Sequence, residues 1–193
     1  MTYIYVVPIA MEDHSDLGML ETFISETFHL ETRRREFPID LKSVFDPNRT
    51  QYNSSLILQQ LIMKPPSDAD KILGVVDVDL FIPILTFVFG EAQLNGIGAV
   101  VSTQRLHNRF YGLPENREVT GERLLKEAIH ELGHTFGLIH CSQSKCVMNS
   151  STYVENIDLK PAELCTLCQK SIKAEKNGPI SRIFPFAWWG SSR

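Results

Sequence analysis

The fold of this chain is decided by one stretch, His130-Glu131-Leu132-Gly133-His134-Thr135-Phe136-Gly137-Leu138-Ile139-His140. It has the form H-E-x-x-H-x-x-G-x-x-H. On an α-helix, the spacing of the first two histidines places both imidazoles on one face, about one turn apart, so that both can reach a single metal ion. Glycine adopts a left-handed backbone at little cost, so Gly137 can end the helix and turn the chain back. The stretch therefore predicts a helix that ends in a sharp turn beside a metal site.

The turn can return His140 to the same metal as a third ligand. Three protein ligands leave one tetrahedral position for water, which is the arrangement of a catalytic zinc rather than a structural one. Glu131 directly follows the first histidine and is the natural base for that water. We therefore predict a catalytic zinc held by His130, His134 and His140, with Glu131 as the catalytic residue.

A surface helix with incidental histidines is the alternative interpretation of the same stretch. At roughly 100° per residue, one face of the helix is apolar, and it carries Leu125, Ala128, Ile129, Leu132 and Phe136. His130 and His134 point roughly 160° away from the centre of that face, by the same helical period. A helix with a core side and a chemically distinct second side suits the floor of a cleft.

The motif resembles that of the metzincin metallopeptidases, whose pattern continues to a methionine-containing turn beneath the metal. Here the chain continues as Cys141-x4-Cys146-x-Met148 and then Cys165-x-x-Cys168. That extension is similar to the archaemetzincin family, which joins the metzincin site to a nearby four-cysteine zinc site. The resemblance covers residues 130–168. It implies a structural zinc held by Cys141, Cys146, Cys165 and Cys168, and an apolar floor beneath the histidines made by Met148.

The cysteine spacing supports a metal site independently of the resemblance. Pairs spaced x4 and x2 favour zinc over disulfides in a reduced compartment. Two disulfides contribute about 2–4 kcal/mol each, whereas a structural zinc contributes on the order of 10 kcal/mol or more. Since the net stability of a whole domain is only about 5–15 kcal/mol, a filled site would decide whether the C-terminal third folds.

Composition and charge limit the classes of partner. The chain has 193 residues, 43% of them hydrophobic, and a formal net charge of −4. This acidity gives no reason to expect nucleic acid or an anionic membrane as partner, and the short basic cluster Arg33–Arg35 is interpreted as a solvated face. The apolar run Tyr3–Ile9 has no preceding positive residues and is interrupted by Pro8, so it fits a signal peptide poorly. We therefore expect a cytoplasmic protein without a pro-segment.

The order of apolar segments predicts the fold class. The first eighty residues alternate strands and helices, which implies βαβ crossovers and a mainly parallel sheet. The expected segments are strand Tyr3–Val7, helix Asp16–His29, strand 31–39, helix Arg49–Met63 and strand Lys71–Val78. Two further strands, Phe87–Gly90 and Gly98–Ser102, are joined through Asn95-Gly96, which favours an antiparallel turn.

The resemblance to metzincins also implies an antiparallel strand at the edge of the cleft that pairs with the bound peptide. We place it at Gly98–Ser102, with an internal strand as the alternative. The expected fold is α/β: a mixed, mainly parallel twisted sheet with this antiparallel cleft-edge strand, packed helices, an active-site helix and a zinc-stabilised C-terminal subdomain.

The later part of the chain is expected to form two helices, an aromatic tail and a separate subdomain. The active-site helix is expected to begin at Thr120 or Gly121. A later helix, from Pro161 to Asn177-Gly178, would carry Cys165 and Cys168 on one face. The aromatic tail Ile183–Trp189 is expected to dock on its own domain, with partner binding as the alternative. We expect an N-terminal subdomain at residues 1–137 and a C-terminal subdomain at residues 138–193.

The function predicted from these features is zinc-dependent hydrolysis of peptide bonds. The chain would hold two zinc ions, one catalytic and one structural, and act on a peptide or protein substrate. Some metzincins carry a tyrosine two residues after the methionine, but Ser150 stands there, and Tyr153 is given no catalytic role. The alternative is a zinc-dependent peptide-binding module with little turnover. A nucleic-acid reader built on the four cysteines is disfavoured because no sustained basic stripe is present.

Overall fold

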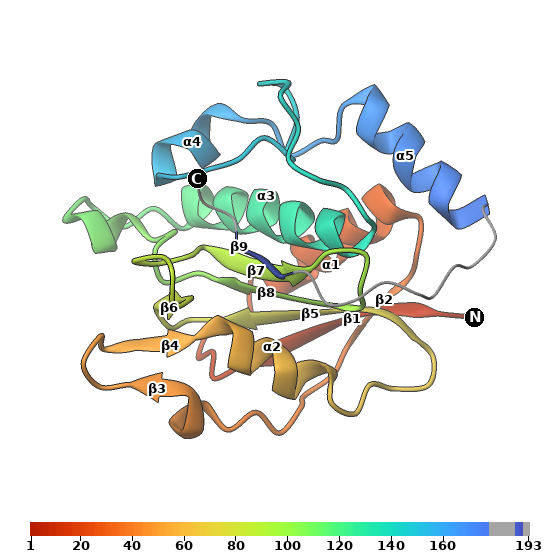
Figure 1. Ribbon diagram of the computed structural model, residues 1–193. Coiled ribbons are helices and arrows are strands. Elements are labelled where there is room, and N and C mark those ends of the chain that lie inside the picture. The colour runs from red at the N-terminus through yellow and green to blue at the C-terminus, as the bar shows by residue number, and fades with distance from the viewer. Residues whose placement is uncertain (178–187, 191–193) are drawn as a thin grey trace.

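The computed structural model describes residues 1–177 and 188–190, and within them a mixed sheet of six strands forms the centre of the molecule (Figure 1). The strand order is β2-β1-β5-β8-β7-β9. The neighbours β2, β1, β5 and β8 run parallel, whereas β7 is antiparallel to both β8 and β9. The strands are β1 (Tyr3–Ile9), β2 (Thr32–Arg34), β5 (Ala69–Val76), β7 (Gly90–Gln93), β8 (Gly98–Ser102) and β9 (Trp188–Gly190). The prediction of a mixed, mainly parallel sheet is confirmed.

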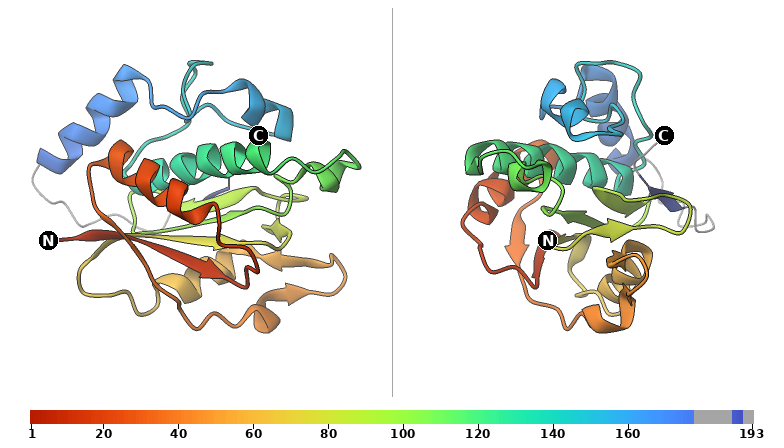
Figure 2. Two further views of the ribbon diagram at one scale, coloured as in Figure 1. Left: turned by 180° about the vertical axis from the view of Figure 1, so that it is seen from behind. Right: turned by 90° about the vertical axis from the view of Figure 1, so that its left-hand side faces the viewer.

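Helices cover both faces of this sheet. Figure 2 shows α1 (Leu17–Phe28) and α3 (Arg117–Thr135) side by side on one face, and Figure 1 shows α2 (Ser54–Ile62) on the other. Parallel strands in such a position must be apolar on both faces, and every residue of β1 is buried. Its side chains alternate between two cores, with Ile4 and Val6 toward α1 and α3, and Val7 and Ile9 toward α2.

A smaller sheet lies beside the main one, and it corrects one predicted boundary. Its strands, in spatial order, are β3 (Phe45–Asp46), β4 (Gln51–Asn53) and β6 (Leu80–Phe81). A short 3₁₀ helix, η1 (Leu41–Val44), precedes it. The helix expected at Arg49–Met63 therefore begins only at Ser54, because Asn53 caps it by accepting a hydrogen bond from the Leu56 backbone N–H. The residues before that cap are paired as strand.

The cleft-edge strand is not where the metzincin resemblance was taken to place it. Gly98–Ser102 is β8, which pairs with β5 on one side and β7 on the other, so the alternative of an internal strand is correct. The antiparallel strand next to it is β7. The outer edge of β7 pairs with β9, so the described part of the aromatic tail docks on its own sheet, while 183–187 lie outside the described residues.

Two helices follow the active-site helix and form a cap over it (Figure 1). They are α4 (Val154–Leu159) and α5 (Thr166–Asn177). The sequence did not predict α4, and α5 begins five residues later than the expected start at Pro161. Cys165 therefore precedes α5 and Cys168 lies in its first turn. A short 3₁₀ helix, η2 (Asn108–Tyr111), leads into α3.

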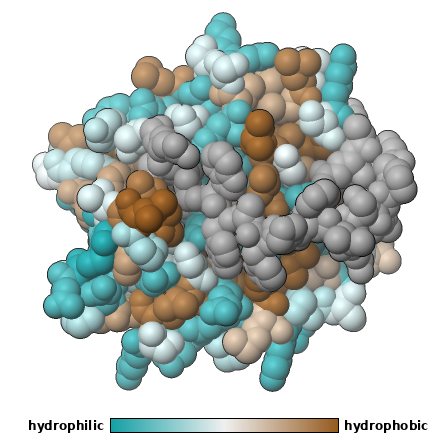
Figure 3. Space-filling model, viewed as in Figure 1, coloured by the Kyte–Doolittle hydropathy of each residue, from teal (hydrophilic) through white to brown (hydrophobic). Residues whose placement is uncertain are grey.

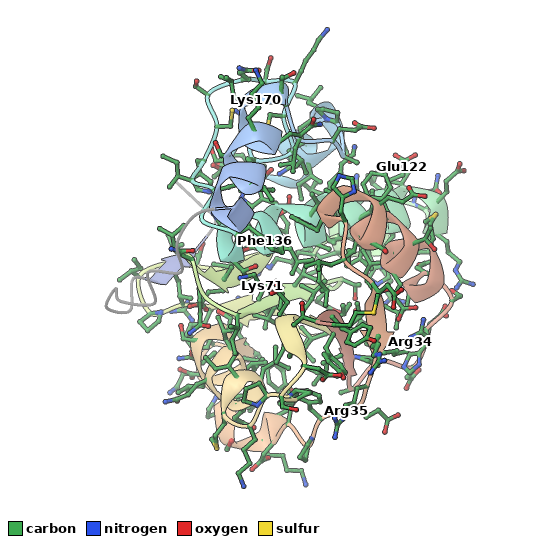
Figure 4. All side chains as sticks on the ribbon, turned by 90° about the vertical axis from the view of Figure 1, so that its right-hand side faces the viewer. Arg34, Arg35, Lys71, Glu122, Phe136 and Lys170 are labelled. Atoms are coloured by element: carbon green, nitrogen blue, oxygen red, sulfur yellow. The ribbon has the colours of Figure 1, made fainter. Side chains whose placement is uncertain are left out.

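Among the residues described, none of the helices combines the length and apolar character needed to cross a bilayer. On the face shown in Figure 3, hydrophobic residues are interrupted by hydrophilic ones. Arg33 and Arg34 form exposed ion pairs with Asp68 and Glu21, so these two members of the basic cluster are solvated, as expected. Figure 4 shows Arg34 and Arg35 at the edge of the sheet.

Candidate active site

Helix α3 carries most of the candidate site and begins earlier than predicted. Asn116 is its N-cap, and its side-chain oxygen accepts a hydrogen bond from the Val119 backbone N–H at 3.2 Å. Asparagine is a strong N-cap residue, and Glu118 follows in the first turn, where a negative charge is favourable. The predicted start at Thr120 or Gly121 overlooked this signal. Glu122, labelled in Figure 4, lies exposed on the helix.

The apolar face of α3 packs on the sheet and on α1. Ala128, Ile129 and Leu132 are fully buried there. Leu124 is buried at the start of this face and Leu125, which was assigned to it, is only half-buried. Phe136 stacks on Phe28 with ring centroids 4.7 Å apart, and the Lys71 ammonium lies 4.7 Å from the centre of the Phe136 ring. Figure 4 labels Phe136 and Lys71. This packing fixes the rotation of α3, so its opposite face points to the site.

Three histidines converge on that opposite face. His130 and His134 lie one turn apart, with their Nε2 atoms 3.2 Å from each other. Gly137, at φ +79°, reverses the chain just after the helix and returns His140 to them. One ligand nitrogen from each histidine lies within 4.8 Å of the others. Ligands of a tetrahedral zinc stand about 3.3 Å apart, so the donor set and its spacing fit zinc.

Backbone carbonyls orient two of these imidazoles. His130 Nδ1 lies 2.8 Å from the Val147 carbonyl oxygen, and His134 Nδ1 lies 2.7 Å from that of Leu138. Because a carbonyl only accepts, each Nδ1 must carry the hydrogen and donate it. Each Nε2 then presents its lone pair to the space between the rings. Such hydrogen bonds fix the ring orientation of metal-binding histidines.

Burial keeps the histidines neutral, which is the form that binds metal. It lowers the pKa of His134 to about 4, holds the pKa of His130 well below its ordinary value, and also lowers the pKa of His140. The Lys160 ammonium is a second cause for His130 and His140, since a nearby positive charge disfavours an imidazolium. At neutral pH the three rings do not have to lose protons before they bind a cation.

Glu131 and Met148 flank the histidines from two sides. Glu131 is fully buried beside β7: a Cβ built on Gly90 would lie 2.6 Å from its Cγ. Met148 is fully buried beneath α3, where a Cβ built on Gly133 would lie 2.5 Å from its Sδ. Gly133 therefore permits the close approach of the methionine turn. β7 therefore borders the acid predicted to be catalytic.

The four cysteines also come together. Their sulfurs lie within 4.8 Å of one another, with 3.9 Å between Cys141 and Cys165 and 3.8 Å between Cys146 and Cys168. All four are free thiols, and a disulfide would need about 2.05 Å. Sulfur ligands of a tetrahedral zinc stand about 3.8 Å apart. The arrangement thus fits a closed four-thiolate site, with the Cys165 backbone N–H donating to the Cys146 sulfur at 3.4 Å.

The thiols differ in how readily they ionise in the absence of metal. Burial raises the pKa of Cys146 and of Cys168. Half-buried Cys165 has its pKa lowered to about 7, mainly because the Cys168 backbone N–H donates to its sulfur. A cation would therefore meet a thiolate first at Cys165 and displace protons from the buried thiols.

An ion pair next to His130 was not predicted. Lys160, the C-cap of α4, places its Nζ 2.8 Å from Glu127 Oε1 and 3.5 Å from His130 Nδ1. The side chains of Lys160 and Glu127 are 2% and 0% exposed. Glu127 precedes His130 by three residues, a spacing that places both on one face of a helix and that was available from the sequence. Its partner Lys160 lies thirty-three residues further along the chain, so the pairing of the two could not be read from the sequence.

Comparison with protein families gives one match that includes the whole site. Residues 32–174 match the family model of Peptidase family M54. A curated protein from Methanocaldococcus jannaschii, named Archaemetzincin, is 48% identical over 126 residues, which cover 65% of this chain and 68% of that protein. Archaemetzincin from Archaeoglobus fulgidus is 36% identical over 174 residues, covering 88% of this chain and 98% of the relative.

Solved structures show the same likeness in three dimensions. The crystal structure of archaemetzincin from Methanopyrus kandleri superposes with a TM-score of 0.79 at 31% identity, covering 92% of this chain and 96% of that one. A structure described as a zinc-dependent peptidase from Methanocorpusculum labreanum gives a TM-score of 0.78 at 29% identity, covering 88% of this chain and 99% of the other.

Proposed function

Since this chain belongs to peptidase family M54, the archaemetzincins, and is a zinc metallopeptidase, we propose that it hydrolyses peptide bonds with Glu131 as general base. The observation that carries the proposal is the convergence of His130, His134 and His140 beside this buried carboxylate. The three histidines would hold a zinc ion, which would supply a Lewis acid to acidify water and polarise the scissile carbonyl. Glu131 accepts the proton of the attacking water and returns it to the leaving amine.

We assign the four cysteines to a second, structural zinc. The closed set of thiols, held within 4.8 Å, supports this assignment, because a structural site has no position left for water. Cys141 follows His140 directly, so the proposed structural ion anchors the segment that presents the third histidine. On this basis the segment around the cysteines is held by a metal as well as by packing, since Met148 and Ile157 belong to the same core cluster as the apolar face of α3.

The substrate is a peptide or protein, and we propose that it binds by strand addition to β7. This strand runs directly against Glu131, and its outer edge accepts an antiparallel strand in the structure itself, where β9 pairs with it. Backbone hydrogen bonds along such an edge hold an extended peptide without requiring particular side chains. Under this proposal, β9 and the substrate compete for the same hydrogen-bonding groups.

The experiment compares Glu131→Ala with the wild type on a mixed peptide library. We expect the variant to keep its zinc by elemental analysis and to lose hydrolysis by at least about 100-fold, the typical contribution of a general base. Glu122→Gln, an exposed change on the same helix, is the control and should keep full activity. Equal inactivity of the wild type and Glu131→Ala would favour the alternative, a zinc-dependent peptide-binding module.

A further inference from the structure

The buried ion pair between Lys160 and Glu127 joins three parts of the site. Lys160 Nζ lies 2.8 Å from Glu127 on α3, and it donates a hydrogen bond to the Asn149 carbonyl oxygen at 3.2 Å. Asn149 follows Met148 in the turn beneath the histidines. The third contact is His130 Nδ1, at 3.5 Å. One side chain from the end of α4 therefore touches the active-site helix, the methionine turn and a proposed metal ligand.

Stability alone gives no reason for such a pair. Two charges removed from water lose more hydration than their attraction returns, unless further hydrogen bonds satisfy them. Here neither carboxylate oxygen of Glu127 accepts a well-aligned hydrogen bond from the described residues, so the contact with Lys160 is an ion pair of incomplete geometry. Apolar side chains of similar size would fill the same space at lower cost.

The position of the pair suggests a role in orienting His130. The Val147 carbonyl, which accepts the His130 Nδ1 hydrogen, lies two residues before the Asn149 carbonyl held by Lys160. The ammonium thus fixes the turn that supplies this acceptor. Glu127 in turn holds the ammonium 2.8 Å away on its own side. The ammonium lies 3.5 Å from Nδ1 without a hydrogen bond between them, because both groups are donors when Nδ1 donates to Val147.

From these contacts we infer that Lys160 and Glu127 are positioning residues for the catalytic metal site. They clamp the 147–149 turn to α3, keep the Nδ1 hydrogen of His130 on the Val147 carbonyl, and leave Nε2 directed at the metal. This inference rests on the proposed role of His130 as a zinc ligand. Without the clamp, the ring is free to reorient, and the fraction of chains with three preorganised histidines falls.

The test replaces the whole pair, in the double variant Glu127→Leu with Lys160→Met, so that no unpaired charge stays buried. We expect a thermal midpoint close to that of the wild type, zinc affinity at the histidine site reduced at least tenfold in chelator competition, and mixed His130 tautomers in metal-free protein by nitrogen-15 NMR. Zinc affinity within twofold of the wild type, together with a single Nδ1–H tautomer, would overturn the inference.

A neighbouring ion pair supplies the matched control. Arg123 and Asp158 also join α3 to the α4 segment, through two hydrogen bonds of 2.7 Å, but Arg123 makes its other side-chain hydrogen bonds with Leu106 and Asn108. Arg123→Met should lower the thermal midpoint and leave zinc affinity and the His130 tautomer unchanged. If Arg123→Met lost as much zinc affinity as the double variant, then zinc affinity would depend on the docking of α4 and not on the Lys160–Glu127 pair.

Two further variants keep the result decisive. If the double variant does not fold, Glu127→Gln, which keeps the shape and removes the charge, should still weaken zinc binding, and an unchanged affinity would refute the clamp. His130→Ala identifies the histidine-site zinc. If His130→Ala binds zinc like the wild type, the proposed function fails. If His130→Ala weakens binding and the pair variants do not, only the positioning role fails.

Discussion

His134 stays neutral in the folded protein at pH values where the unfolded chain would protonate it, so this one residue makes the stability of the protein depend on pH. Burial lowers the pKa of His134 to about 4, against an ordinary value of 6.5. In the unfolded chain this imidazole takes up a proton as pH falls below 6.5, whereas in the folded metal-free protein it does so only near pH 4. The stability that this histidine contributes is therefore fully present above pH 6.5 and is lost as pH falls toward 4.

We expect the free energy of unfolding of the metal-free protein to fall by about 3 kcal/mol between pH 6.5 and 4 on account of His134 alone. Urea denaturation at a series of pH values measures it, and the wild type should lose this much more than His134→Gln over the same range. Parallel curves for wild type and His134→Gln would contradict the prediction.

The elements around the site show why sequence reasoning succeeded at some positions and failed at others. β1 and α3 were predicted because a run of apolar residues or a helical period marks them directly. The edge position was assigned to β8 wrongly, because which strand lies at the edge depends on pairing between distant segments. The short helix α4 was missed because its six residues span less than two turns and bury only Val154 and Ile157.

The candidate site also contains residues that the sequence predicted and residues that it did not. The histidines and Glu131 lie in one short motif with fixed spacing, so their convergence was predictable from helix geometry and one glycine turn. The meeting of the four cysteines was expected from the family resemblance and from the spacing of the two pairs. The Lys160–Glu127 pair could not be predicted, because thirty-three residues separate its members and no feature of the sequence near Lys160 points to Glu127. The role of Gly90, which allows β7 to lie close against Glu131, could likewise not be predicted, because the two residues meet only in the folded sheet.

Strand β9 leads to a prediction at the level of the element. If substrates add to the outer edge of β7, then removing residues 188–193 should free that edge and lower KM for peptides several-fold, with little change in kcat. Steady-state kinetics on one peptide series measures both. A chain that lacks only 191–193 keeps β9 and serves as the control, since it should behave as the full chain does. An unchanged or higher KM on removal of β9 would place substrates elsewhere.

The whole molecule depends on its proposed structural zinc more than on any single core contact. Such an ion contributes on the order of 10 kcal/mol, comparable with the total net stability of a domain. Cys165→Ser should therefore lower the thermal midpoint strongly and reduce the zinc content from two ions per chain to one or fewer, by elemental analysis. Ser142→Ala, at an exposed position between the ligands, should change neither. An unchanged midpoint and zinc content in Cys165→Ser would exclude a structural site there.

The direct bond between His140 and Cys141 has a consequence for how the enzyme matures. Consecutive Cα atoms across a trans peptide are about 3.8 Å apart, and no described peptide bond is cis. Because one peptide bond joins the two residues, the placement of the third imidazole is linked to that of the adjoining sulfur. We therefore expect zinc bound by the cysteines to raise the zinc affinity of the histidines, and the reverse. Under the proposal of two zinc ions, a newly made chain becomes hydrolytically competent more readily once its cysteines hold their metal.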